Sequence, residues 1–111
     1  MNPRKSKKIP YLVLCTASTS LEANKIARFL IAHQLAACVN IIPDIKSVFL
    51  WKKKLQETRE CLLIIKTEKK QLQKIKSAIL KLHSYSVPEI IGWPIQWGSQ
   101  TYLDWVSKSV L

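Results

Sequence analysis

Glycine and acidic residues are both scarce in this 111-residue chain, which contains two Gly and seven Asp and Glu against 18 Lys and Arg. So little glycine, without any biased tract, is the profile of a packed fold and not of a disordered segment. Hydrophobic residues make up 48% of the sequence, a share typical of a packed domain. The formal net charge of +11 predicts a strong field that attracts phosphates and acidic surfaces.

The chain also lacks paired cysteines and long apolar runs. Cys15, Cys38 and Cys61 form no C-x-x-C pair and are odd in number. They predict neither a disulfide framework nor a structural zinc site, and reduced thiols fit the cytoplasm. The apolar run over 9–14 is too short for a membrane span or for a typical signal-peptide core. We therefore expect a cytoplasmic protein that is not embedded in a membrane.

Hydrophobic periodicity predicts seven elements in the order β, α, β, β, α, β, α, after a basic flexible tail over 1–9. The remaining residues, 10–111, form a single domain. Thr19 is followed by Glu22 at capping-box spacing, and Thr67 and Ser99 are candidate caps of the later helices. The strands are expected over 10–16, 37–52, 55–66 and 89–95, and the second of them bends near Pro43. The first helix is expected over 20–34, the second from after Thr67 to Leu82, and the third after Ser99.

This order predicts an α+β fold of the ferredoxin-like, split βαβ type. Two interleaved right-handed βαβ units place the strands in the order 4-1-3-2 in an antiparallel sheet, with both long helices on one face. The second and third strands form a hairpin that is too long for a compact four-stranded sheet, with Phe49, Leu50 and Trp51 near its tip. Pairing with a partner chain would cover these side chains, so we expect a cyclic homo-oligomer.

The predicted topology also brings together residues that are far apart in sequence. Because the fourth strand runs against the first, Cys15 at the end of the first strand lies near Glu89 at the start of the fourth, and the loop with His83 reaches the same corner. A thiolate, an imidazole and a carboxylate suit copper or zinc better than magnesium or calcium. For Cys15 and His83 the alternative interpretation is structural: Cys15 as an inert buried thiol, and His83 as a helix cap or a surface residue.

Several motifs in a fixed order resemble the CutA family of divalent-cation tolerance proteins, from about Tyr11 to Val106. They are Leu14-Cys15-Thr16-Ala17, residues 35–41, Trp51, Ile64-Ile65-Lys66-Thr67, His83 with Tyr85, Pro88-Glu89-Ile90, and Tyr102-Leu103 with Trp105. The sequence departs from the family pattern at Lys53, where the family usually has Gly, and at Ser84, where it usually has Pro. Lys53 predicts a different hairpin turn, and Ser84 a less rigid loop.

The resemblance implies a homotrimer that binds copper or other divalent metals weakly, with no obligatory cofactor and no established catalysis. The family's metal ligands correspond to Cys15, His83 and Glu89. The expected contact residues of the trimer and its hairpin are Phe49, Leu50, Trp51, Tyr85 and Trp105.

Two other classes of function compete with this one. Nucleic-acid binding would suit the charge and the strand order, which the RNA recognition motif shares, but that module needs aromatic residues on its third strand and the run 61–65 has none. A small-substrate hydrolase would need a nucleophile with a base and an orienting partner, and no such set emerges. Binding without catalysis is therefore the favoured expectation.

Overall fold

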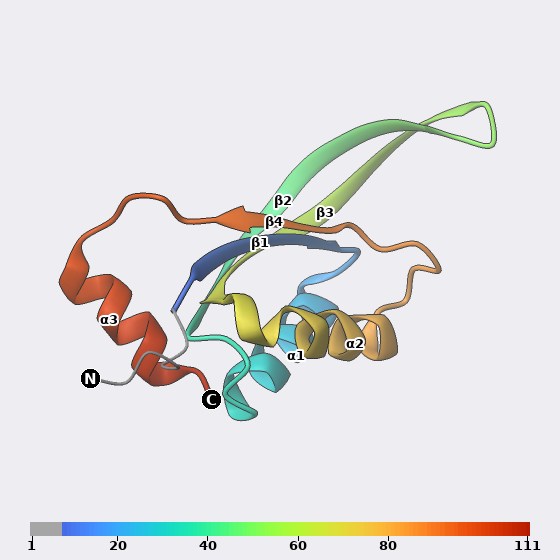
Figure 1. Cartoon of the computed structure of the whole chain (residues 1–111). Coiled ribbons are helices and arrows are strands. Elements are labelled where there is room, and N and C mark those ends of the chain that lie inside the picture. The colour runs from blue at the N-terminus through green and yellow to red at the C-terminus, as the bar shows by residue number, and fades with distance from the viewer. Residues whose placement is uncertain (1–7) are drawn as a thin grey trace, which may run out of the picture.

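The computed structural model describes residues 8–111 and contains a four-stranded antiparallel sheet with three α-helices (Figure 1). Its elements are β1 (Pro10–Ala17), α1 (Ser20–Ala32), β2 (Cys38–Trp51), β3 (Lys54–Glu68), a 3-10 turn (Lys69–Gln71), α2 (Leu72–Leu82), β4 (Ile90–Pro94) and α3 (Gln100–Ser109). The sheet order is β2-β3-β1-β4, which confirms the predicted order and the ferredoxin-like class. Residues 1–7 of the predicted tail lie outside the described residues.

The hydrophobic core lies between one face of the sheet and the helices α1 and α2, which run below the sheet in Figure 1. Alternate residues of β1 and β3 point into this core, as the two-residue period of a strand requires. They pack against the apolar stripe of each helix. Its fully or nearly fully buried members include Val13, Cys15, Leu63, Ile65, Ile26, Leu30, Ile75 and Ile79.

The opposite face of the sheet is also apolar, and no helix of the described chain covers it (Figure 1). Because Val13 and Cys15 point into the core, their neighbours Leu12 and Leu14 point to this second face. The residues paired with Leu12 and Leu14 on β3 and β4 lie on the same face. We call it the open sheet face. It carries Leu12, Leu14, Leu62, Ile64, Ile91 and Trp93.

Both ends of α1 are closed by local hydrogen bonds. The amide of Glu22 donates to Thr19 Oγ1 at 3.1 Å, which confirms Thr19 as the N-cap, while the Glu22 carboxylate reaches back to the amide of Ser18 at 3.5 Å. At the other end, the amides of Gln34 and Leu35 donate to carbonyls one turn back, at 3.0 and 2.9 Å. The helix ends at Ala32, two positions earlier than predicted, and Gln34 beyond it has φ 54°, in the left-handed region that commonly follows a helix.

The cap predicted at Thr67 is wrong. Thr67 lies inside β3, fully buried, and its hydroxyl donates to the carbonyl of Leu35 at 2.6 Å. β3 therefore continues to Glu68, and a 3-10 turn separates it from α2. In sequence, a threonine whose hydroxyl binds a loop carbonyl looks the same as a threonine that caps a helix.

The hairpin of β2 and β3 extends well beyond the rest of the sheet and gives the chain extents of 58 × 25 × 23 Å (Figure 1). Its pairing runs from Cys38 opposite Lys66 to Trp51 opposite Lys54, with a register shift between Ile42 and Ile45. This bulge confirms the predicted bend near Pro43.

The third helix packs across the far end of the sheet, beside the start of β1 in Figure 1. Its Val106 side chain and Val110 just beyond it are buried, and Ser107 Oγ donates to Glu68 Oε2 at 2.6 Å. Across the described residues, no helix is long and apolar enough to cross a membrane.

The tip of the hairpin is strained. Lys52 and Lys53 form a two-residue turn with φ values of 51° and 66°, a conformation that glycine adopts without steric cost and lysine does not. We expect Lys53→Gly to raise the free energy of unfolding by about 0.5–1 kcal/mol. Thermal unfolding at a fixed protein concentration measures this change. The control, Lys54→Gly, removes a paired strand residue and is expected to lower stability; equal or lower stability of Lys53→Gly would contradict the strain argument.

Candidate functional site

The end of β1, the start of β4 and the loop over 83–89 meet at one corner of the sheet. Cys15 lies directly opposite Ile90 of β4 and Leu63 of β3. The loop over 83–89 connects α2 to β4 and therefore passes the end of β1. The predicted meeting of these three segments is present, and the positions of the individual side chains decide what it can bind.

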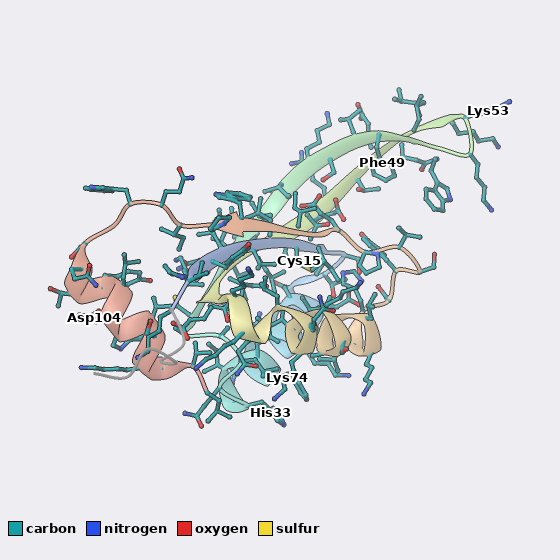
Figure 2. The ribbon with its side chains drawn as sticks, in the orientation of Figure 1. Cys15, His33, Phe49, Lys53, Lys74 and Asp104 are labelled. Carbon is teal, nitrogen blue, oxygen red and sulfur yellow. The ribbon has the colours of Figure 1, made fainter. Side chains whose placement is uncertain are left out.

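Cys15 points into the core, between the sheet and the helices (Figure 2). Its side chain is fully buried, and its thiol points to the carbonyl of Thr16 at 3.6 Å. Burial, reinforced by the carboxylates of Glu89, Glu22 and Glu60, raises the pKa of the Cys15 thiol to about 12. The free protein therefore holds a neutral thiol at this position.

His83 is a buried connector between α2 and β1. Its Nε2 lies 2.6 Å from the carbonyl oxygen of Thr16, and the backbone amide of Tyr85 donates to Nδ1 at 3.1 Å. The Tyr85 contact makes Nδ1 an acceptor, which leaves Nε2 as the nitrogen that donates to Thr16, and Glu22 Oε1 also lies 3.6 Å from Nδ1. Because the side chain has no exposed surface and both nitrogens are engaged, His83 acts structurally in the single chain.

A further hydrogen bond joins the loop after His83 to α1. Ser84, where the resembling family usually has Pro, donates its amide to Glu22 Oε2 at 3.1 Å. A proline could not make this bond. This hydrogen bond between the loop and α1 therefore compensates for the rigidity expected to be lost at Ser84.

Glu89 lies on the other side of the sheet from Cys15 and lines an open cavity of about 640 Å³. The cavity lies between the hairpin and the loop that precedes β4. Its walls include Thr16, Phe49, Trp51, Glu60, Tyr85 and Glu89. Tyr85 donates its hydroxyl to Glu60 Oε2 at 2.7 Å, and burial together with this bond raises the pKa of Tyr85.

The corner therefore brings the chain segments of the three predicted ligands together without gathering their donor atoms. Cys15 faces the helices, while Glu89 and Thr16 face the cavity, because successive strand residues point to opposite faces. Among residues 8–111, no three His, Cys, Asp or Glu side chains are arranged to hold a metal ion. Within one described chain, Cys15, His83 and Glu89 do not fit a metal as they stand, and their joint role stays a prediction.

Sequence reasoning missed Glu60, Thr16 and Glu22, which all lie at this corner. Glu60 is only 6% exposed although it is charged, and it shares the phase of Leu62 and Ile64 on β3. An acidic residue in the same strand phase as the apolar Leu62 and Ile64, on the open sheet face, is the available signal. Glu22 was assigned to the helix cap alone, although its second oxygen also binds the loop amide.

Four of the five residues expected to make contacts between subunits lie at the surface, whereas Tyr85 is partly buried. Phe49 and Trp51 are 42% and 49% exposed on the hairpin, and Leu50 is more exposed still. Trp105 is half exposed on α3, with its ring centroid 5.6 Å from that of Tyr102. Their role as contacts stays a prediction.

The sheet order, the long hairpin and this corner define a small α+β protein of the ferredoxin-like type with an acid-lined cavity at the base of the hairpin. A family model described as "CutA1 divalent ion tolerance protein" matches residues 11–109. The chain belongs to this family of divalent-ion tolerance proteins.

Three similar proteins support the family assignment. The divalent-cation tolerance protein CutA of Thermus thermophilus is 40% identical over 98 residues, covering 88% of this chain and 95% of that protein. The chloroplastic protein CutA of Arabidopsis thaliana is 42% identical over 105 residues, 94% of this chain and 58% of that longer protein. The crystal structure of CutA1 from Oryza sativa has a TM-score of 0.90 at 38% identity, covering 93% and 94% of the two chains.

The raised pKa of Cys15 predicts that its thiol resists alkylation. With a pKa of about 12, about one thiol in a thousand is ionised at pH 9, and the side chain has no exposed surface. We expect peptide mass spectrometry to find no iodoacetamide adduct on Cys15 in the native protein at pH 9, and a complete adduct after unfolding. Cys38, which is partly exposed, is the internal control. Rapid native labelling of Cys15 would contradict this account.

Proposed function

We propose that this protein is a cytoplasmic homotrimer that binds copper or other divalent metal ions and acts by binding, not by catalysis. The observation that carries the trimer is the open sheet face. The divalent-ion part of the proposal rests on the family and on the acidic corner at the end of β1. The cytoplasmic part rests on three free cysteines in a chain with no disulfide among its described residues.

The open sheet face is the main reason to expect association. An antiparallel sheet that faces water on one side usually carries polar residues there. Here β1 and β3 place Leu12, Leu14, Leu62 and Ile64 on that side, and β4 adds exposed Ile91 and Trp93. An apolar surface of this kind, extended by the hairpin, is a site for another protein surface.

A second copy of this chain is the proposed occupant. The hairpin projects from one side of the subunit, whereas β4 is the free edge strand on the other side of the sheet. A contact between two different surfaces of identical chains is heterologous, and it closes as a ring when the rotation permits. Three copies would cover the open sheet faces together.

Native mass spectrometry should therefore find three subunits at micromolar concentration. Ile91→Lys places a charge on the open sheet face and is expected to shift the population to single subunits, because a buried lysine without a partner opposes association. Leu21→Lys, at an 82% exposed position on α1, is the matched control and should leave the trimer intact. A folded single subunit as the main species of the parent protein would end the proposal.

The metal proposal concerns the corner of Cys15, His83 and Glu89. Sulfur, imidazole and carboxylate donors are suited to copper or zinc. Binding there would require Cys15 to lose its proton and the loop over 83–89 to move, because His83 is bonded to Thr16 and Tyr85 and Glu89 faces the cavity. Weak binding is the expected consequence, since those bonds must be broken first.

Titration of Cu(II) into the purified protein tests this site. We expect Cys15→Ser, His83→Ala and Glu89→Gln each to weaken the site by about tenfold or more, because each removes a ligand. His33→Ala and Cys38→Ser are matched controls, since these side chains lie outside the corner. Circular dichroism of each variant separates lost binding from lost folding. Unchanged affinity in all three folded ligand variants would rule this site out.

Nucleic-acid binding is the less favoured function. In the RNA recognition motif, aromatic residues on the central strands of an uncovered sheet face stack on bases. The equivalent positions of β1 and β3 here are Leu12, Leu14, Leu62 and Ile64. Aliphatic side chains cannot supply stacking, so only the charge of +11 would remain to bind phosphates.

A further inference from the structure

The cavity at the base of the hairpin is lined by aromatic and polar groups that, apart from Glu89, have no part in the metal proposal. Its volume of about 640 Å³ falls within the range of small-molecule pockets, about 300–1,000 Å³. β1, both strands of the hairpin and the loop before β4 each contribute to it. Two aromatic side chains, Phe49 and Trp51, stand on its hairpin wall; both are exposed in the single chain and are also proposed subunit contacts. Apolar walls thus surround a small number of polar groups.

The charge of this cavity is opposite to that of the protein. The chain carries 18 Lys and Arg against seven Asp and Glu, yet two of those seven, Glu60 and Glu89, line this cavity. No Lys or Arg of the described chain lines it. The field of the positively charged protein repels cations. A preference for a cationic ligand here would therefore come from the local acidic groups.

Glu60 is the best-defined polar group in the cavity. It is 6% exposed, lies on the cavity wall and accepts the hydroxyl proton of Tyr85 at Oε2. A carboxylate has two oxygens and about four acceptor positions, so this bond leaves capacity for a ligand donor. Tyr85 holds the carboxylate in place, and Glu89 stands on the loop side of the same cavity.

We propose that this cavity binds a small organic cation that carries an ammonium group on an apolar body. The ammonium group would lie near Glu60 and Glu89, and the aromatic rings of Phe49 and Trp51 would contact the cation and its apolar part. Aromatic faces attract cations, more strongly the further water is excluded. This site and the proposed metal site share only Glu89. The cavity, its aromatic wall and Glu60 belong to the organic-cation site alone.

A bare metal ion is a poorer match for the same space. The volume greatly exceeds the roughly 30 Å³ that one water occupies in the liquid. Divalent ions need several oxygen, nitrogen or sulfur ligands around one point, and residues 8–111 contain no group of three acidic, His or Cys side chains arranged in this way. Apolar Phe49, Trp51 and Val87 would contribute nothing to a metal, whereas they fit an organic molecule.

Isothermal titration of the assembled protein, in buffer with a chelator to remove metals, tests the proposal. The ligands are phenethylamine, its neutral analogue 2-phenylethanol and the anion phenylacetate. We expect phenethylamine to bind at least about tenfold more tightly than 2-phenylethanol, and phenylacetate not to bind measurably. Because the whole protein is positive, a preference for the amine reports the local acidic groups.

Variants identify the groups responsible. Glu60→Gln, Glu89→Gln and Trp51→Leu should each weaken phenethylamine binding by about fivefold or more. Glu57→Gln is the matched control: Glu57 is a hairpin carboxylate outside the cavity, paired with Lys46 at 3.6 Å, and should leave the affinity unchanged. If Glu60→Gln fails to fold, exposed Glu89 decides the matter alone. Equal affinity for amine and alcohol, no amine binding, or full affinity in Glu89→Gln overturns the proposal.

Discussion

Antiparallel pairing of β1 on both of its edges is the constraint on which the rest of the structure depends. β1 pairs with β3 along its whole length and with β4 from Tyr11 to Cys15. The first pairing fixes the base of the hairpin, and the second brings the loop over 83–89 to the end of β1. Core, cavity and corner are all consequences of this central strand.

The same pairing separates groups that are neighbours along the backbone. Thr16 follows Cys15, yet Cys15 is buried among the helices while Thr16 lines the cavity. Glu89 precedes Ile90, the β4 partner of Cys15, and it also faces the cavity. A prediction based on which strand ends meet is correct about the backbone, but the alternation of side chains decides which donors share a compartment.

Much of the fold was predictable because local signals and topology agree. The order of elements, the sheet order, the Thr19 cap and the bend near Pro43 each depend on periodicity or on turn chemistry that is visible in the chain. The left-handed conformation of Gln34 and the core-facing hydroxyl of Thr67 were not visible, because tertiary contacts decide both. Neither residue type is preferred for the place it occupies.

The candidate site was less predictable for a related reason. Topology and the family resemblance both indicate Cys15, His83 and Glu89 as metal ligands, whereas the structure gives the first two structural contacts. Glu60 attracts little notice in sequence, where it lies among the polar residues of the hairpin. Its importance comes from burial beside Tyr85, which depends on how the loop before β4 folds over the hairpin.

The placement of acidic residues links the corner to the rest of the protein. Glu22, Glu60 and Glu89 all contribute to the raised pKa of Cys15, so three of the seven acidic residues surround one end of β1. Like charges in one region cost stability unless hydrogen bonds or a cation offset them. Glu22 is bonded to two loop amides and Glu60 to Tyr85, whereas Glu89 has an exposed side facing the cavity. Glu22 and Glu60 thus help to fold the corner, while Glu60 and Glu89 both line the cavity with carboxylate groups.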